Sequence, residues 1–245
     1  MKLTFLYYAS DSFVSRAKVL TDSIQKFHPD SNISYVNPGP KPIGKYIHGM
    51  AKERLRKALE LLEKGHECVV VIGADCELFG PLNEITKGTD SYKDVLLVPH
   101  VKRPIKNRGF MAQLYRSGHA NADLMVFKNS NNSKEILKWM ISVTESECNT
   151  EGIFYEQTWL SALPFLFGGV GIIHNEGYNV GYWDLEENKI SNKDGLWFIG
   201  DHPIVFFQYS GYLKGSPEKA SRYFKYNVTG DTLEFFKNYE KRITE

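Results

Sequence analysis

Short apolar runs alternate along the chain with stretches in which apolar residues recur every three or four positions. The runs are typical of buried strands and lie at 3–8, 33–36, 69–72, 95–98, 124–127, 171–174 and 204–207. Helical spacing predicts helices over 13–27, 55–62 and 134–143, and start signals predict others from 156, 216 and 231. Strands that alternate with helices indicate an α/β protein. No repeat or linker divides the 245 residues, so one domain is expected.

The buried run Val69–Ile72 is followed by acidic residues that alternate with small ones. The sequence continues as Gly73-Ala74-Asp75-Cys76-Glu77, and Gly80-Pro81 then breaks the chain. Carboxylates just beyond a buried strand lie at the carboxyl edge of the sheet, where open α/β sheets bind ligands. Because side chains alternate in an extended segment, we expect Asp75 and Glu77 to point to one side and to share a cation. The alternative is ordinary turn chemistry at a strand end.

The first predicted strand is followed by a short polar turn, Ala9-Ser10-Asp11-Ser12, and then by a helix. This order is typical of a mononucleotide-binding unit, although the chain carries no Gly-x-Gly-x-x-Gly fingerprint. Ala9, Ser10 and Asp11 are therefore candidates for contact with a base or a ribose. A second interpretation, compatible with the first, is that Ser10 or Asp11 caps the helix.

Other polar positions have more ordinary interpretations. Residues 105–118 hold three basic side chains and two glycines, and we expect a mobile loop of the kind that covers a site. Arg54 and Arg56 lie on a predicted helix and are expected to face solvent rather than a phosphate. His100 is expected to be a hydrogen-bonded loop histidine rather than a base. Pro164 is expected to interrupt the helix that begins near 156.

Composition excludes several classes of protein. With 42% hydrophobic and 13% aromatic residues the chain can bury a sizeable core. A net charge of +1 without a basic tract argues against a nucleic-acid partner. Three cysteines without metal-like spacing favour a reducing compartment. No signal peptide or membrane-spanning segment is evident, so a cytoplasmic protein without an integral membrane segment is expected.

Several short blocks, in this order, resemble glycosyltransferases of the GT-A fold. The resemblance covers about residues 3–214 and is to the family 8 type and to bacterial relatives that carry Tyr-Asn-x-Ala-Tyr-Trp-Asn-Leu and Phe-Phe-His-Phe-Ser-Gly. The blocks are Ala9–Phe13, Gly73-Ala74-Asp75, Gly80-Pro81-Leu82, Asn121-Ala122-Asp123, Glu156-Gln157, the aromatic stretch 177–185, and Gln208-Tyr209-Ser210-Gly211 with Lys214. The resemblance implies a single Rossmann-like GT-A domain with a mostly parallel mixed sheet flanked by helices. Its nucleotide-binding part would be about 1–100, its sugar and acceptor part about 101–215, and its C-terminal helices about 216–245.

The resemblance also implies roles for individual residues. The nucleotide-sugar donor would contact the first turn (Ala9, Ser10, Asp11) and Asp75, Asn121 and Lys214, with Lys214 binding the diphosphate. Glu156, Gln157 and Asp123 would face the sugar at the reacting carbon. Tyr178, Asn179 and Trp183 are the candidates for the acceptor side. Asp75, Glu77 and Gln208 would hold a divalent cation, Mn²⁺ or Mg²⁺, against the departing diphosphate.

The chain departs from the family pattern where the cation would bind. Gly73 removes the first acid of Asp-x-Asp, Gln208 replaces a histidine ligand, and Asp123 stands where a glycine is expected. Glu77 could replace the lost acid. Alternatively, Lys214 with a basic loop residue such as Arg103 could neutralise the diphosphate without metal. The remaining alternative is an inactive protein.

The sequence thus favours an enzyme that moves a sugar from a nucleotide-sugar, most simply a UDP-sugar, to a saccharide or glycan acceptor. A sugar nucleotidyltransferase is one alternative, but it predicts a Gly-rich basic loop after the first strand, which the turn at 9–12 lacks. A catalytically silent module that binds nucleotide-sugars or glycans is the other, suggested by Gly73 and Gln208.

Overall fold

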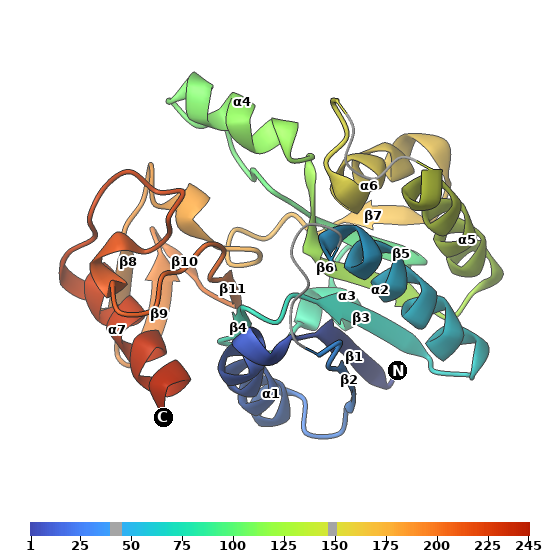
Figure 1. Ribbon diagram of the computed structural model, residues 1–245, viewed down its shortest axis with the longest axis horizontal. Coiled ribbons are helices and arrows are strands. Elements are labelled where there is room, and N and C mark those ends of the chain that lie inside the picture. The colour runs from blue at the N-terminus through green and yellow to red at the C-terminus, as the bar shows by residue number, and fades with distance from the viewer. Residues whose placement is uncertain (40–45, 147–150) are drawn as a thin grey trace.

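The computed structural model describes residues 1–39, 46–146 and 151–245. A six-stranded sheet forms its larger part, with the strands in the order β2-β1-β3-β6-β5-β7 (Figure 1). These strands are β1 (Leu3–Tyr8), β2 (Asn32–Val36), β3 (Cys68–Ile72), β5 (Val95–Pro99), β6 (Ala120–Lys128) and β7 (Val170–Ile172). β2–β1, β1–β3 and β5–β7 pair in parallel, whereas β6 is antiparallel to both of its neighbours. The expected α/β class with a mostly parallel mixed sheet is confirmed.

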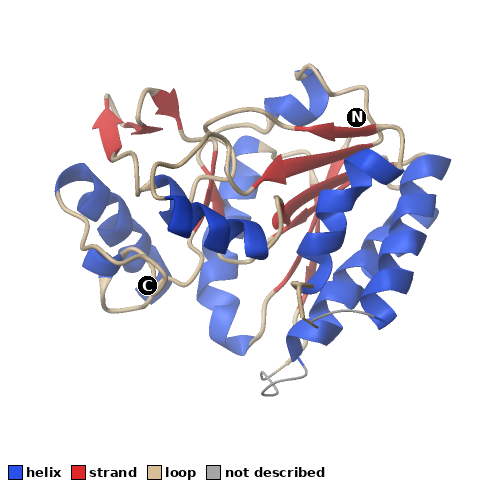
Figure 2. Ribbon diagram, turned by 90° about the horizontal axis from the view of Figure 1, so that it is seen from above, coloured by secondary structure: helices blue, strands red, loops and turns tan. Residues whose placement is uncertain are grey.

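Helices cover both faces of the sheet (Figure 2). α1 (Val14–Phe27) and α3 (Asn83–Lys87) pack on one face, and α2 (Tyr46–Glu63), α5 (Asn131–Ser146) and α6 (Tyr155–Leu166) pack on the other. Side chains of β3 alternate between the two apolar cores: Val70 and Ile72 face the first, Val69 and Val71 the second. Burial on both faces explains why this strand is a continuous apolar run.

The direction of β6 gathers four polar segments at one edge of the sheet. Because β6 is antiparallel to β3 and β5, its first residues lie beside the last residues of those strands. Ile72 pairs with Leu124, and Pro99 pairs with Ala120. The segment 121–123 therefore lies beside 73–75 and next to His100, and the turn after β1 opens on the same side because β1 is parallel to β3.

The C-terminal part forms a second layer beside this edge (left in Figure 1). β4 (Cys76–Leu78) pairs with β11 (Phe206–Gln208), and a small antiparallel sheet follows from β8 (Ile190–Lys193), β9 (Leu196–Ile199) and β10 (His202–Pro203). The sequence did not predict these three short strands. α7 (Gly230–Thr244) closes this part with aromatic side chains, and the rings of Tyr209 and Tyr239 stack 3.4 Å apart at 3°.

The expected mobile loop at 105–118 is wrong, because most of it forms the helix α4 (Arg108–Arg116). The Asn107 side chain caps this helix by accepting a hydrogen bond of 3.1 Å from the Phe110 N–H. Leu114 packs with Ile105 and Trp183 in a small apolar cluster. Apolar residues at helical spacing therefore outweighed the two glycines and the basic residues.

Two other helix expectations also fail. α6 continues through Pro164 to Leu166, so Pro164 does not end it. The helix expected from 216 is only a 3-10 turn at Pro217–Lys219. Among the described helices, none combines the length and apolar character needed to cross a membrane. Cys68 and Cys76 are buried free thiols, and Cys148 lies outside the described residues.

Candidate functional site

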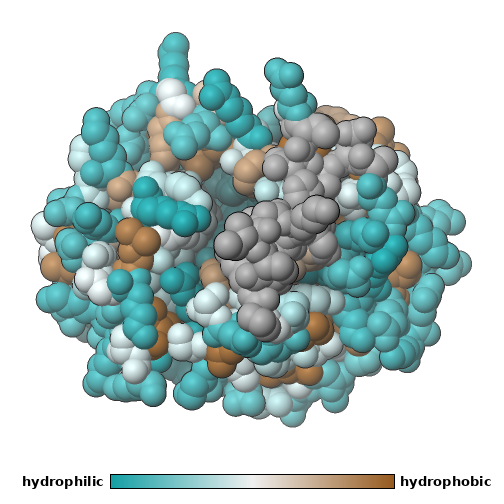
Figure 3. Space-filling model, in the orientation of Figure 1, coloured by the Kyte–Doolittle hydropathy of each residue, from teal (hydrophilic) through white to brown (hydrophobic). Residues whose placement is uncertain are grey.

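Two adjoining cavities open at the carboxyl edge of the sheet. The main cavity has a volume of about 460 Å³ and the side cavity about 210 Å³. Met50, Arg54 and Asp123 line both. On the face drawn in Figure 3, hydrophilic side chains predominate and the surface is hollowed near its middle.

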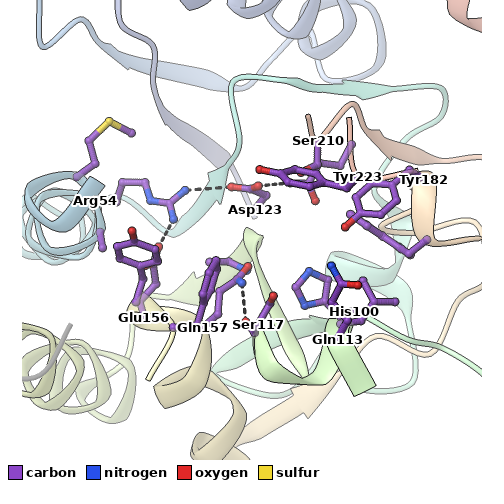
Figure 4. A pocket seen from close by; sticks show the side chains of 18 residues that line it. Arg54, His100, Gln113, Ser117, Asp123, Glu156, Gln157, Tyr182, Ser210 and Tyr223 are labelled. Atoms are coloured by element: carbon purple, nitrogen blue, oxygen red, sulfur yellow. Dashed lines mark hydrogen bonds and ion pairs between the residues drawn. The ribbon is translucent and has the colours of Figure 1, made fainter. Parts of the chain in front are cut away.

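The main cavity has two chemically different ends. Figure 4 shows Arg54 and Glu156 at one end, His100, Gln113 and Tyr182 at the other, and Asp123 between them. Its remaining lining residues include Ser117, Phe154, Tyr155, Gln157, Trp183, Gln208, Ser210 and Tyr223. The side cavity is lined by the strand ends, with Tyr8, Ser10, Phe13, Ile72, Gly73, Ala74 and Asp75.

Asp123 fills the space that a side chain at position 73 would need. A Cβ atom added to Gly73 would lie 2.7 Å from Asp123 Cγ and 2.8 Å from Asp123 Oδ1. The backbones are also bonded, since the Gly73 N–H donates to the Asp123 carbonyl oxygen at 3.1 Å. The acid missing at Gly73 and the acid gained at Asp123 therefore occupy one place.

Asp75 lies in the turn between β3 and β4 and lines the side cavity with Asp123. Within the part of the chain that the structure describes, its carboxylate makes no hydrogen bond to another side chain. Burial and, secondarily, the charge of Asp123 raise the pKa of Asp75 to about 6, against smaller opposing effects of Arg16 and Arg54. Asp75 and Asp123 thus place two carboxylates close together at the side cavity.

Arg54 reaches from α2 to the two acids of the main cavity. Its Nη1 lies 3.1 Å from Asp123 Oδ1, and its Nη2 pairs with Glu156 Oε1. Burial disfavours the charge, but the two carboxylates outweigh burial and raise the pKa of Arg54. The expectation that Arg54 faces solvent is wrong, because its side chain is only 12% exposed. Arg56, two residues further along α2, is 46% exposed and pairs with surface glutamates as expected.

A chain of amides fixes the direction in which Gln208 points. Asn179 Nδ2 donates to the Pro99 carbonyl at 2.9 Å, so Asn179 Oδ1 accepts from Asn121 Nδ2 at 3.0 Å. Asn121 Oδ1 accepts from the Asp123 N–H at 2.9 Å, so Asn121 Nδ2 also donates to Gln208 Oε1 at 2.7 Å. Gln208 Nε2 is left to donate to Asp123. Because main-chain groups set the polarity at both ends, the Gln208 carbonyl oxygen that was expected to bind a cation accepts a hydrogen bond from Asn121.

Glu77 does not join Asp75, and the expectation that the two point to one side is wrong. Asp75 lies in a turn, so the alternation of an extended segment begins only at β4. Glu77 is buried between β4 and α7, where it pairs with Arg242 and accepts a hydrogen bond of 2.9 Å from the Tyr209 hydroxyl. Burial raises the pKa of Glu77, against the lowering effect of Arg242. Glu77 lines neither the main nor the side cavity.

The two basic side chains expected at the diphosphate, Lys214 and Arg103, also lie outside the two cavities. Lys214 is exposed, and its Nζ lies 3.5 Å from the Ile243 carbonyl oxygen at the end of α7. Arg103 lies 3.5 Å from Glu176. Neither residue lines the main or the side cavity. Arg54 is therefore the basic side chain found in both cavities.

The first turn contributes to the site in part. Ser10 lines the side cavity, and its hydroxyl lies 3.2 Å from that of Ser12. Ala9 is buried, with its N–H bonded to Val36. Asp11 is exposed and accepts a hydrogen bond of 3.0 Å from Asn37 Nδ2. Ser10 precedes the short helix Asp11–Phe13 without a side-chain capping bond.

The three residues expected at the reacting carbon, Asp123, Glu156 and Gln157, all line the main cavity. Glu156 is engaged by Arg54. Gln157 is held by the backbone: its Nε2 donates to the Ser117 carbonyl at 2.7 Å, and its Oε1 accepts from the Ala122 N–H at 3.0 Å. Gln157 therefore fixes the start of β6 against the end of α4.

Of the three acceptor candidates, only Trp183 lines the main cavity. Tyr178 is buried, and its hydroxyl accepts a hydrogen bond of 3.2 Å from the Glu84 N–H. Asn179 is fully buried in the amide chain. Tyr182 and Tyr223 also line the main cavity, and their ring centroids lie 5.8 Å apart. Tyr182 is adjacent to a named candidate, whereas Tyr223 lies in a segment with no motif.

Comparison with known proteins bears on the fold. No family model matches the chain. The uncharacterized proteins YfnF and YfnD of Bacillus subtilis (strain 168) are 31% and 29% identical to it over 99 and 108 residues. These matches cover 39% and 42% of this chain and 33% and 35% of the relatives. The matched part is thus about a third of those proteins.

Solved glycosyltransferases share this fold. The glycosyltransferase GlyE of Streptococcus pneumoniae TIGR4 superposes on the whole chain with a TM-score of 0.56 at 14% identity, over 62% of its own length. The galactosyltransferase LgtC, solved with donor and acceptor sugar analogs, superposes on 98% of the chain with a TM-score of 0.53 at 12% identity, over 95% of its length. The likeness at such identities is one of fold.

Proposed function

We propose that this protein is a glycosyltransferase that moves a sugar from a nucleotide-sugar, most simply a UDP-sugar, to a saccharide or glycan acceptor. One observation carries the proposal: the carboxylates of Asp75 and Asp123 and the guanidinium of Arg54 meet where two cavities join at the carboxyl edge of the sheet. A nucleotide in the side cavity and a sugar in the main cavity would place the diphosphate at this junction.

Transfer of the sugar leaves a nucleoside diphosphate with added negative charge, so the site must supply positive charge in advance. A divalent cation, Mn²⁺ or Mg²⁺, fits two hard carboxylate oxygens in a place where burial raises the pKa of Asp75. Asp75 and Asp123 would hold it, and when bound it would add charge against the diphosphate. The described residues include no group of three or more His, Cys, Asp or Glu side chains placed to hold a metal, so the diphosphate itself would complete the coordination.

The protein's own groups would orient the donor around this centre. Gln208 donates to Asp123 and Arg54 holds Asp123 from the other side, so the carboxylate is fixed before a donor arrives. Arg54 also fixes Glu156 at the wall of the main cavity through Glu156 Oε1. The other carboxylate oxygen of Glu156 can accept a hydrogen bond from a sugar hydroxyl. In this arrangement Glu156 binds the sugar and Asp123 binds the cation. Gln157 is a positioning residue.

The proposal is tested by incubating the protein with a panel of nucleotide-sugars, with and without Mn²⁺ or Mg²⁺, and following thermal shift and donor hydrolysis. We expect at least one UDP-sugar to raise the melting temperature and to be hydrolysed, and Asp75→Ala to abolish hydrolysis while the protein stays folded. Glu234→Gln, on the exposed face of α7, is the matched control. Failure of every nucleotide-sugar to bind would contradict the proposal.

The silent module is a second candidate, favoured by the engagement of the Gln208 carbonyl with Asn121 and by Lys214, which lines neither the main nor the side cavity. Binding without turnover under every condition would favour it. Release of pyrophosphate from a nucleoside triphosphate and a sugar phosphate would instead favour a nucleotidyltransferase.

A further inference from the structure

His100 is a buried histidine to which the proposed donor chemistry gives no role. It follows β5, its side chain is only 6% exposed, and it lines the main cavity at the end away from Arg54 (Figure 4). Figure 4 shows the neutral side chains of Gln113 and Tyr182 at this end and the charged side chains of Arg54 and Glu156 at the other. A sugar acceptor and a diphosphate donor need surfaces of these two kinds.

The hydrogen bonds of His100 fix its tautomer. Nδ1 lies 2.9 Å from the Gly118 carbonyl oxygen. A carbonyl oxygen only accepts, so Nδ1 carries the proton and Nε2 carries the lone pair. Among the described residues, Nε2 has no hydrogen-bond partner. The cavity wall therefore presents an unused acceptor atom.

The ring is held in place from both sides. Trp183 contacts it edge-on, with centroids 5.3 Å apart at 85°. Gly118 lies against Gln157 so closely that a Cβ there would be 2.7 Å from the Gln157 carbonyl oxygen. Only a glycine, here at φ +105°, allows this approach, and it fixes the carbonyl that orients His100. Burial lowers the pKa of His100, which keeps the ring neutral.

Two tyrosines that line the main cavity together with His100 offer flat apolar faces. The ring centroids of Tyr182 and Tyr223 lie 5.8 Å apart, and Tyr223 is 46% exposed. Exposed aromatic rings stack on the apolar faces of sugars, and a hydroxyl at the edge of such a sugar needs a polar partner. Nε2 of His100 is an acceptor for that hydroxyl.

We propose that His100 Nε2 accepts a hydrogen bond from a hydroxyl of an uncharged sugar that lies against Tyr182 and Tyr223, which makes His100 an acceptor-binding residue. This inference rests on the proposed function, because it assigns the second substrate of the same site. It commits to a neutral saccharide: the nearest basic side chain lining the cavity, Arg54, is already paired with two acids.

The test is saturation-transfer-difference NMR at pH 7.5 with methyl β-galactoside, methyl β-glucoside, methyl α-mannoside and methyl N-acetyl-β-glucosaminide, and with glucuronic acid as the charged probe. We expect at least one neutral glycoside to give a saturation-transfer-difference signal and, in protein-observed spectra, to shift the His100 Hε1 resonance. His100→Asn keeps an amide near Gly118 but loses the Nε2 acceptor, and should weaken binding about tenfold. His100→Gln can place an oxygen near the Nε2 position and should recover most of it.

His119→Asn is the matched control, because His119 is exposed and lines neither cavity; it should bind as the wild type does. Circular dichroism and melting temperature establish that each variant folds. Wild-type protein that binds a nucleotide-sugar but no neutral glycoside would overturn this inference alone. Equal glycoside binding by wild type and His100→Asn, or preference for glucuronic acid, would also overturn it. A wild-type protein that binds no nucleotide-sugar would instead contradict the proposed function.

Discussion

Asp75 lies beside a second carboxylate in a partly buried turn, and this arrangement costs the folded state free energy at neutral pH. Its pKa is about 6 in the folded protein, above the ordinary 3.8. A raised pKa of an acid means that folding takes up a proton between these values, so the contribution of Asp75 to stability is present below pH 3.8 and lost as the pH rises through 6. The free energy involved is on the order of 1–3 kcal/mol.

Asp75→Asn should therefore stabilise the protein in metal-free buffer at pH 7.5, by that order of magnitude, because the amide cannot ionise. The gain should disappear near pH 4, where Asp75 is protonated in the wild type. Urea unfolding at both pH values measures this. Mn²⁺ or Mg²⁺ should stabilise the wild type and leave Asp75→Asn unaffected. A variant less stable than the wild type at pH 7.5 would show that Asp75 is satisfied in the folded protein.

At the scale of the elements, an acidic side chain at the site comes from Asp123 of β6 instead of from position 73 after β3. Substitutions at the two positions test whether the carboxylate can be supplied from either strand. Asp123→Gly removes the carboxylate, and Gly73→Asp alone forces its Cβ to 2.7 Å from Asp123 Cγ. Each single change should lower donor hydrolysis by about 10²-fold or more. The double variant moves the acid to the other strand and should recover activity to within about tenfold. Activity of the double variant no better than that of the poorer single variant would refute the interchangeability of the two positions.

Arg54 joins α2 to β6 and α6 through its two ion pairs. Arg54→Met should cost about 3–5 kcal/mol of unfolding free energy, because it leaves two carboxylates without their partner in a largely buried place. Arg56→Met removes an exposed arginine from the same helix and should cost less than about 1 kcal/mol. Denaturant unfolding of the pair of variants separates the two cases, and similar losses would contradict the assigned burial of Arg54.

At the scale of the whole molecule, α7 is joined to β4, the strand that follows β3 in the chain, through Arg242 and Glu77. Glu77→Gln should destabilise the protein by about 2–4 kcal/mol, because it leaves Arg242 without its carboxylate. Donor hydrolysis per folded molecule should be unchanged, because Glu77 lines neither cavity. The test is donor hydrolysis by Glu77→Gln, measured below its melting transition and compared with that of Asp75→Ala. Unchanged hydrolysis indicates a structural role of Glu77, whereas a loss like that of Asp75→Ala indicates the cation-binding role that the sequence suggested.

Local pattern was enough to predict the α/β class and the main strands and helices of the larger sheet. The apolar run at β3, the helical spacing of α1 and α2, and the polar turns after β1 and β3 are properties of neighbouring residues, and each lies where the sequence predicts. The carboxyl edge as the place of the site follows from the same strand ends. The helix α4 shows the limit of this reasoning, because composition indicated a loop while the apolar contacts with Trp183 favoured a helix.

Only the tertiary structure decided which charged and amide groups meet. Asp123 occupies the space beside Gly73 because β6 runs antiparallel to β3. Gln208 donates its amide N–H to Asp123 because its carbonyl oxygen accepts from Asn121, whose orientation is fixed in turn by Asn179 and the Pro99 carbonyl. Arg54 lies in the site and Glu77 lies outside it, against expectation, because their ion-pair partners are far away in sequence. Burial and periodicity are local and can be read along the chain, whereas the partner of a polar side chain depends on contacts between distant segments.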